Sequence, residues 1–571
     1  MVAFLAPMLM AASLGQAAPA EAVWLKSIPA DVAVVARVKA LETGRDDLLK
    51  MLEAMSPNAA GIATPQIEQG LTIFSAQYTK QAVQNPFFVI ARLPKDGPLP
   101  PWAVLIQASD YLGVVKAVSG KDDVAPKSLG GYDSFEKADG QVWYSAKGNG
   151  FVAFGADEDL VKSVAKPAKS LDEAISAEHK ARLLGGDLGI YINAASLQTQ
   201  YADQIDQAKQ AFAGIVDQAG GQIAPNVSDM MKNFSGGMFD AIKEGDALTL
   251  NLDFATEGLN VSSFVTVKPG SNAEKSLKAG SAGPGSFLGK LPIDAASYAY
   301  LNLDSKLLAK LQKPALGILG IGGKTSPDLE KALALQAESG TGETYAAGSV
   351  GGVPTSNVSF TTPKDPAKAV EAVTLTLKAM KGDSGLIKDL ALTPNAQTYK
   401  GFVLNEAKMT LDLTKLIAPG APGGVEALKK LRGGETVTTW YGTDGKTVLS
   451  LAAPTFDDVK ALIDSTLAGK NSLGDSANYA ALRKAFPADV NAIFVLNAQA
   501  MIKQIASQLG SAPRAEIKIP ADMPKTPAFF GASFLASPKG LGLQLVVPSN
   551  VGPVIEKGLI PVIQGMQGQI Q

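Results

Sequence analysis

The sequence predicts an α+β protein made of two pseudo-repeated halves, each an antiparallel β-sheet with helices packed on one face. Two observations predict this fold: short signatures recur in both parts of the chain, and several segments read as strand, tight turn, strand and then helix. Because the chain has 571 residues, we also expect more than one hydrophobic core, and therefore two to four domains.

The first signature is an apolar residue, a proline, any residue and an aspartate, followed by an apolar strand pattern. It occurs with Asp31, Asp294 and Asp489, and a weaker copy contains Asp187. Self-similarity of this kind indicates internal duplication.

The second signature is a Trp-Tyr pair, three intervening residues and then a glycine. It occurs at Trp143 and at Trp440, and each copy leads into a strand, a helix, a Ser-Leu pair and a second helix. The matching order predicts that the first half spans about 24–285 and the second about 286–571, with Trp143 equivalent to Trp440.

Turn residues support the sheet assignment. Strand patterns turn back at Glu257-Gly258 and at Lys539-Gly540, where glycine supplies the positive φ that tight turns need. Strands of this kind are apolar on one face, which must be covered, and helices cover it most economically. The expected architecture is therefore an antiparallel sheet with helices on one face.

The N-terminus resembles a signal peptide. An apolar run from Val2 to Leu14 precedes small residues, with Ala-Pro-Ala at 18–20 as one cleavage site and Ala17 as another. The run is too short to span a bilayer, and it lacks a basic residue before Lys26, which departs from the usual pattern. We expect residues 1–20 to be a leader, the protein to be exported to the periplasm or the extracellular space, and the mature chain to have no transmembrane segment.

Composition excludes several chemistries. The chain has no cysteine, so thiolate metal sites, iron–sulfur clusters and thiol nucleophiles cannot form. Its single histidine, His179, rules out sites with two or more imidazoles in one chain, and the charged residues around it predict a solvent-exposed helix face. A net charge of −2 gives no electrostatic reason to expect nucleic acid.

No motif predicts a catalytic, cofactor-binding or metal-binding residue. The segment 317–325 lacks the first glycine of a phosphate-binding loop, and Ser163-x-x-Lys166 lacks the accompanying motifs of penicillin-binding enzymes. Acidic residues such as Asp157 and Asp458 fall at helix starts, where they are expected to cap free amides. We therefore expect no cofactor.

The Pro-x-Asp signatures, the Ser-Leu pairs and the leader resemble a family of exported bacterial proteins of unknown function that is common in planctomycete-type genomes. The resemblance implies export and a repeated α+β architecture, and it brings no activity or active-site residues with it.

Three functions follow from these features as hypotheses. The first is a non-catalytic envelope or periplasmic protein that binds a protein partner or has a structural role. The second is a carrier of an apolar, lipid-like small ligand, since layers of sheet and helix can enclose a pocket. The third is a carboxylate-dependent hydrolase, because the separation of two acids depends on the fold.

Overall fold

The fold is known from a computed structural model. It describes residues 20–77, 83–94, 100–199, 244–277, 281–303, 327–340, 342–348, 357–382, 387–416, 434–510 and 519–562, with a few isolated positions between. Residues 1–19 of the expected leader and the glycine-rich segment 317–325 lie outside the described residues.

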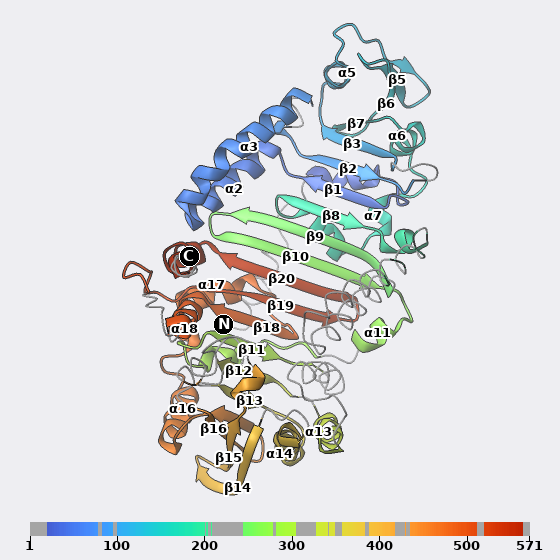
Figure 1. The fold of residues 1–571 in the computed structure, drawn as a ribbon. Coiled ribbons are helices and arrows are strands. Elements are labelled where there is room, and N and C mark those ends of the chain that lie inside the picture. Colours follow the sequence, from blue (N-terminus) through green and yellow to red (C-terminus); the bar gives the residue numbers. More distant parts are fainter. Residues whose placement is uncertain are drawn as a thin grey trace, which may run out of the picture.

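The described strands form one antiparallel sheet that runs the length of the molecule (Figure 1). The strands before residue 285 are β1 (Val34–Val38), β2 (Phe87–Ala91), β3 (Trp102–Gln107), β4 (Lys127–Ser128), β5 (Asp133–Glu136), β6 (Val142–Lys147), β7 (Phe151–Gly155), β8 (Leu188–Ile192), β9 (Gly245–Ala255) and β10 (Gly258–Val267). Those after it are β11 (Ser297–Leu301), β12 (Thr344–Gly348), β13 (Val358–Thr361), β14 (Ile387–Tyr399), β15 (Phe402–Leu411), β16 (Thr436–Thr443), β17 (Val448–Ala452), β18 (Ala492–Asn497), β19 (Phe529–Ser537) and β20 (Gly540–Pro548).

The strands pair in the same order in both parts of the chain. The first ten follow the order β4-β5-β6-β7-β3-β2-β1-β8-β9-β10. The last ten follow the order β14-β15-β16-β17-β13-β12-β11-β18-β19-β20. The two runs meet where β10 pairs with β20, from Gly258 opposite Pro548 to Val265 opposite Leu541. One continuous sheet results.

Helices connect these strands. Those before residue 285 are α2 (Leu41–Met55), α3 (Pro57–Gln77), α5 (Tyr111–Ser119), α6 (Glu158–Ala165), α7 (Leu171–Ala174), α8 (Ala177–Leu184) and α11 (Asn272–Leu277), with the 3-10 helix η2 (Ala20–Lys26). Those after it are α13 (Pro327–Glu338), α14 (Pro366–Gly382), α16 (Phe456–Ala468), α17 (Ala477–Ala485), α18 (Ala498–Gly510) and α19 (Gly552–Val554), with the short helices η3 (Ser286–Lys290), η4 (Leu413–Leu416), η5 (Leu473–Asp475), η6 (Ser549–Val551) and η7 (Ile555–Leu559). None of the described helices is long and apolar enough to cross a membrane.

Helices pack on both faces of the sheet, so the expectation that they lie on one face is wrong. Successive strand residues point to opposite faces, and in β2 Phe88 packs with Leu160 of α6 while its neighbour Phe87 packs with Val114 of α5. At the other end of the sheet, Trp440 packs with α16 on one face and Tyr441 faces α14 on the other. The strands near both ends are apolar on both sides, which requires a cover on each.

Trp143 and Trp440 lie in β6 and β16, which hold the same place in the two strand orders, but they face opposite sides of the sheet. Trp143 packs with Trp102 and Phe154 in the cluster that α5 covers, whereas Trp440 packs with Phe456 at the start of α16. The expected equivalence of the two tryptophans is therefore wrong. A difference of one residue in register is enough to turn every side chain of a strand to the other face.

The Pro-x-Asp and Ser-Leu signatures contact each other in both parts of the chain. An isolated bridge joins Pro29 to Ser170, and another joins Pro292 to Ser472. Beside them, the amide of Leu171 donates to the Ile28 carbonyl at 2.7 Å, and the amide of Leu473 donates to the Leu291 carbonyl at the same distance. The signatures therefore hold the helix that follows the Ser-Leu pair against the strand that follows the aspartate.

The concave face as candidate functional site

The six central strands of the sheet carry an uncharged, largely apolar face. Residues directly opposite each other in an antiparallel ladder lie on one face, and the register places Leu250 opposite Ser263, and Ser263 opposite Leu543. The residues of this face are Leu188, Ile190 and Ile192 of β8; Leu248, Leu250 and Leu252 of β9; Leu259, Val261, Ser263 and Val265 of β10; Leu541, Leu543, Leu545 and Val547 of β20; Phe530, Ala532 and Phe534 of β19; and Ala492, Phe494 and Leu496 of β18. We call it the concave face.

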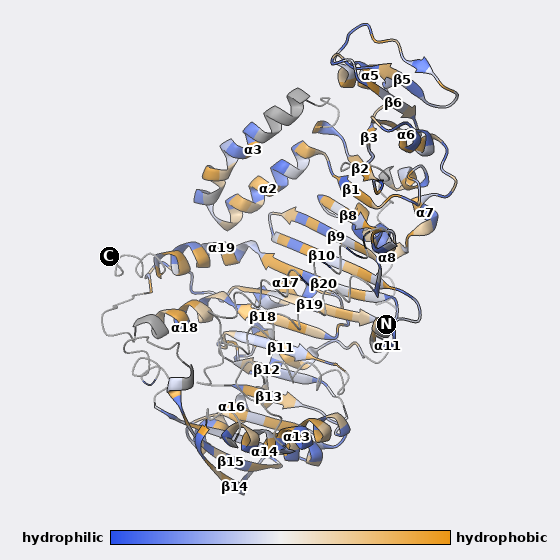
Figure 2. Cartoon of the chain, turned by 45° about the vertical axis from the view of Figure 1, so that its right-hand side comes forward, coloured by the Kyte–Doolittle hydropathy of each residue, from blue (hydrophilic) through white to orange (hydrophobic). Residues whose placement is uncertain are grey.

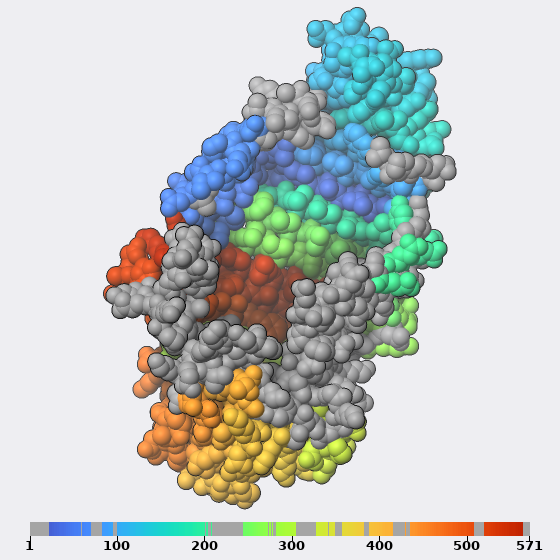
Figure 3. Space-filling view, in the orientation of Figure 1, coloured from blue at the N-terminus to red at the C-terminus, as the bar shows by residue number. Residues whose placement is uncertain are grey.

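Figure 3 shows the concave face hollowed between α2 and α3 above and the yellow and orange end of the sheet below, with β9, β10 and β20 forming its floor. Three large side chains of the floor remain open to solvent: Leu543 is 51% exposed, Phe494 49% and Leu545 38%. Hydrophobic residues run along these strands in Figure 2. An exposed apolar surface of this kind is unusual for a soluble domain unless it binds something.

The opposite face of the same strands, which we call the convex face, carries polar groups under helices. Thr249 is fully buried and Asn251 is 8% exposed, and both alternate with leucines of the concave face. Asn251 donates to the carbonyl of Arg182 in α8 at 2.8 Å. The central strands thus bury polar groups such as Asn251 beneath α8, together with apolar side chains such as Phe264, and leave the apolar concave face open.

The size of the floor follows from strand geometry. Strands about 4.8 Å apart and about 3.4 Å of rise per residue give roughly 24 Å across the six strands and 20 Å along them, or about 500 Å². That area is at the upper end of the largest apolar patch on typical monomers, roughly 300–600 Å².

Two pockets adjoin the floor at its ends. One, of about 450 Å³, lies over β11 to β13 and β16 to β18 and is lined by small side chains such as Ala299, Ala346 and Ser359, with Phe494 at its edge. The other, of about 470 Å³, lies where α2 and α3 cross the ends of β1, β8 and β9. We call the second the α2–α3 pocket.

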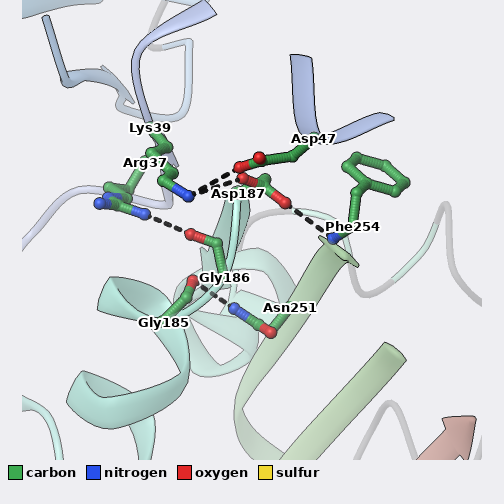
Figure 4. A network of polar contacts seen from close by, with 8 residues as sticks. All are labelled: Arg37, Lys39, Asp47, Gly185, Gly186, Asp187, Asn251 and Phe254. Carbon is green, nitrogen blue, oxygen red and sulfur yellow. Dashed lines mark hydrogen bonds and ion pairs between the residues drawn. The ribbon is translucent and has the colours of Figure 1, made fainter. Parts of the chain in front are cut away.

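A polar network forms one side of the α2–α3 pocket (Figure 4). Asp187 is 4% exposed. Its carboxylate accepts a hydrogen bond from the amide of Phe254 at 2.7 Å and forms an ion pair with Lys39 at 3.3 Å. Lys39 also contacts Asp47 of α2 at 3.0 Å, and so fixes that helix to the sheet. Beside it, Arg37 donates to the carbonyl of Gly186 at 2.7 Å.

Burial and the nearby charges shift the pKa values of Lys39 and of the neighbouring Asp253. Partial burial alone would lower the pKa of Lys39, but the hydrogen bond to Asp47 and the negative charge of Asp187 outweigh it, and the net effect raises the pKa. Burial raises the pKa of Asp253, and repulsion from Asp187 raises it further. Asp47 and Asp187 share one lysine, so the network is a structural ion-pair cluster.

His179 is buried, so the expectation of a solvent-exposed histidine is wrong. Its exposed fraction is 2%. Its Nδ1 contacts the hydroxyl of Thr249, its Nε2 lies 3.1 Å from the hydroxyl of Thr266, and its ring packs edge-on against Tyr191 and Phe264. Burial and, to a lesser extent, the charge of Arg182 lower the pKa of His179 to about 4. The ring is therefore neutral at pH 7 and joins helix to sheet.

The other motif residues cap or tie helices. The Asp157 carboxylate accepts from the Leu160 amide at 2.7 Å, as expected for an N-cap, and Asp458 forms a capping box with Thr455. The Ser163 hydroxyl donates to the carbonyl of Leu160 at 2.7 Å. Within the described ranges there is no group of three or more metal-ligating side chains.

No protein-family model, no curated protein and no solved structure matches the chain. The concave face, its two pockets and the polar network are therefore interpreted from their own chemistry.

Sequence reasoning missed the concave face. The alternation in β9 and β10 was visible, but nothing in it says which side the helices cover.

The burial of His179, in contrast, had a usable signal in the sequence. Helices α8 and α17 begin after the capping residues Ser176 and Ser476, and His179 and Tyr479 each follow three residues later. Both side chains are buried against the sheet. An aromatic at that position in one half indicates a core position in the other.

Proposed function

We propose that the chain is a duplication of one α+β unit, with halves at 24–285 and 286–571. The matching strand order supports it, and so do backbone hydrogen bonds that recur between matching strands of the two halves. The amide of Asn193 donates to Ala33 at 2.8 Å, and that of Asn497 donates to Ala296 at 3.0 Å. Each of these asparagines also accepts from the amide three residues later, at the start of the next helix.

We propose further that the protein is an exported, non-catalytic binding protein whose concave face binds an apolar segment of a protein partner. The observation that carries this proposal is the uncharged floor of β8, β9, β10, β20, β19 and β18, with Leu543, Phe494 and Leu545 open to solvent. Apolar area of this extent contributes to association chiefly by leaving water, at about 25 cal/mol per Å².

The dimensions of the floor favour a segment of protein. An α-helix with its side chains is about 10–12 Å across, so a floor roughly 24 Å wide accommodates a helix with side chains packed on both flanks. A single small molecule would cover only part of such a floor. The absence of charged side chains on it argues against a partner recognised through salt bridges.

Carboxylate-dependent hydrolysis has less support. Asp187 is the acidic residue in the lining of the α2–α3 pocket, and it is committed to Lys39 and to the amide of Phe254. The pocket at the other end of the floor has no acidic side chain in its lining.

Cross-linking from the floor tests the proposed partner. The residue Leu543 is replaced by a photo-reactive phenylalanine analogue in the native host, with Leu112 of α5, which is 51% exposed, as the matched control position. We expect position 543 to yield one discrete protein adduct whose cross-linked peptide is apolar, and position 112 to yield none. The adduct should disappear when Leu545→Glu is added. It should persist when Leu129→Glu is added, because Leu129 follows β4, outside the floor, and is 37% exposed.

Other outcomes of this experiment contradict the proposal. An adduct with lipid mass would mean that the floor binds lipid, an adduct with a second copy of the chain would mean self-association, and equal adducts from positions 543 and 112 would mean that the floor is not selective.

The same preparation tests export by mass spectrometry of the N-terminus. The mature protein should begin between Ala18 and Glu21, and an intact Met1 would contradict a cleaved leader.

A further inference from the structure

The α2–α3 pocket has the properties of a small-ligand site in its own right. Its volume of about 470 Å³ falls within the range of roughly 300–1,000 Å³ that small-molecule sites occupy. Three walls surround it: the sheet contributes Val38, Leu188 and Phe254, α2 contributes Leu41 and Leu48, and α3 contributes Ile67. Nearly all of the atoms that line it are apolar.

A glycine opens the α2 wall. Gly44 lies in the interior of α2, where glycine is unfavourable relative to alanine by roughly 1 kcal/mol. A Cβ placed on Gly44 would meet no atom within 4 Å, so the space beside it is empty. Gly44 therefore leaves room for something other than the protein's own side chains.

The charged residues at the pocket are already paired. Lys39 contacts Asp47 and Asp187, and Arg45 contacts Asp46 at 2.7 Å and Glu68 at 3.5 Å. A ligand that relied on a free cation or a free carboxylate would find neither among these groups. The part of the ligand that enters the pocket must be neutral and apolar.

We propose that the α2–α3 pocket binds the hydrocarbon chain of an amphiphile, with its polar head group left in solvent. This inference goes beyond the proposed partner binding and does not depend on it. The chain lies on Val38, Leu188 and Phe254 at the end of the concave face, under the roof that α2 and α3 form, and Gly44 lets it approach the backbone of α2.

Filling the pocket tests the site. The probe is N-phenyl-1-naphthylamine, a neutral apolar dye whose fluorescence rises when it leaves water, and hexadecanol and palmitate serve as competitors. We expect one saturable site in the wild type and at least a tenfold loss of affinity in Gly44→Leu, because the new side chain enters the empty space. The matched control is Gly61→Leu in α3, where a Cβ also meets no atom but the residue is exposed outside the pocket; its affinity should stay within twofold of the wild type.

Three further measurements separate the alternatives. Leu543→Glu should leave dye affinity unchanged, and a tenfold loss there would place the dye on the concave floor instead. Hexadecanol and palmitate should compete within about threefold of each other, and a preference of more than tenfold for palmitate would overturn the neutral-chain assignment. The melting temperature of Gly44→Leu should not fall. If that variant fails to fold, Ile67→Phe narrows the same pocket from α3. Unchanged dye affinity in a folded variant with a filled pocket would overturn the site.

Discussion

We expect the stability of the protein to fall by up to about 3 kcal/mol as the pH drops from 6.5 to 4, through His179 alone. The pKa of this histidine is about 4 in the folded chain, against an ordinary value of 6.5. In the unfolded chain the ring therefore takes up a proton through this interval while the folded chain does not. A lowered histidine pKa gives stability that is fully present above pH 6.5 and lost as the pH falls to about 4.

Chemical denaturation at several pH values measures this effect. In His179→Gln the pH dependence between 6.5 and 4 should be shallower than in the wild type by up to about 3 kcal/mol. At pH 7 the variant should also be less stable, because the hydroxyls of Thr249 and Thr266 lose their buried partner, at about 1–3 kcal/mol for each unpaired group. Since the chain has one histidine, its proton resonance can be titrated directly, and a midpoint near 6.5 would contradict the buried ring.

The second large effect is expected at Asn491, which is fully buried just before β18. Its side-chain oxygen accepts from the amide of Ala536 at 2.7 Å, and its Nδ2 donates to the carbonyl of Ser281 at 2.9 Å. Asn491→Ala leaves both backbone groups without this partner. We expect a loss of about 3 kcal/mol in the free energy of unfolding, measured in urea at pH 7, and a loss below 0.5 kcal/mol would contradict it.

A charge exchange at the same place tests the duplication. Asp187 occupies the corresponding position before β8. Its carboxylate accepts a hydrogen bond from the Phe254 amide. Its backbone carbonyl accepts from the backbone amide of Lys39, just as the carbonyl of Asn491 accepts from the backbone amide of Asn302. Asn491→Asp alone should destabilise at pH 7, because it buries a carboxylate without a cation. Adding Asn302→Lys should recover part of the loss by recreating the Lys39–Asp187 pair, and no recovery would count against the proposed equivalence.

Much of the fold could be predicted from local patterns, because the relevant physics is local. The turns at Glu257-Gly258 and Lys539-Gly540 connect β9 to β10 and β19 to β20, and Gly258 and Gly540 have φ of 137° and 153°. The α+β class and the antiparallel sheet were predicted correctly for the same reason: alternation and turn residues act within a few positions of each other.

What could not be predicted depends on contacts between distant segments. His179 sits among charged neighbours, Glu178, Lys180 and Arg182, and only its packing against Thr249 and Phe264, which lie far along the chain, makes it a core residue. The sequence also did not indicate which face of the central strands the helices cover. In β9 leucines such as Leu250 alternate with polar residues such as Thr249, and the hydrophobic pattern alone would have placed the leucines under the helices.

The width of the charge-free floor arises from one more non-local feature, the pairing of β10 with β20. That pairing places the ends of both strand runs side by side, so that apolar residues of β9, β10, β20 and β19 form a single surface. Neither half alone would present a floor of this width.

Reactivity of single cysteines tests most directly whether the concave face is a binding surface. The chain has no cysteine, so Leu543→Cys and Leu112→Cys each introduce one unique thiol, at positions that are both 51% exposed. Each variant is labelled with a maleimide twice, once as purified protein and once in the native host. We expect both thiols to react at similar rates in the purified protein, and in the host we expect position 543 to react at least tenfold more slowly than position 112. Equal labelling of the two positions in the host would contradict a covered concave face.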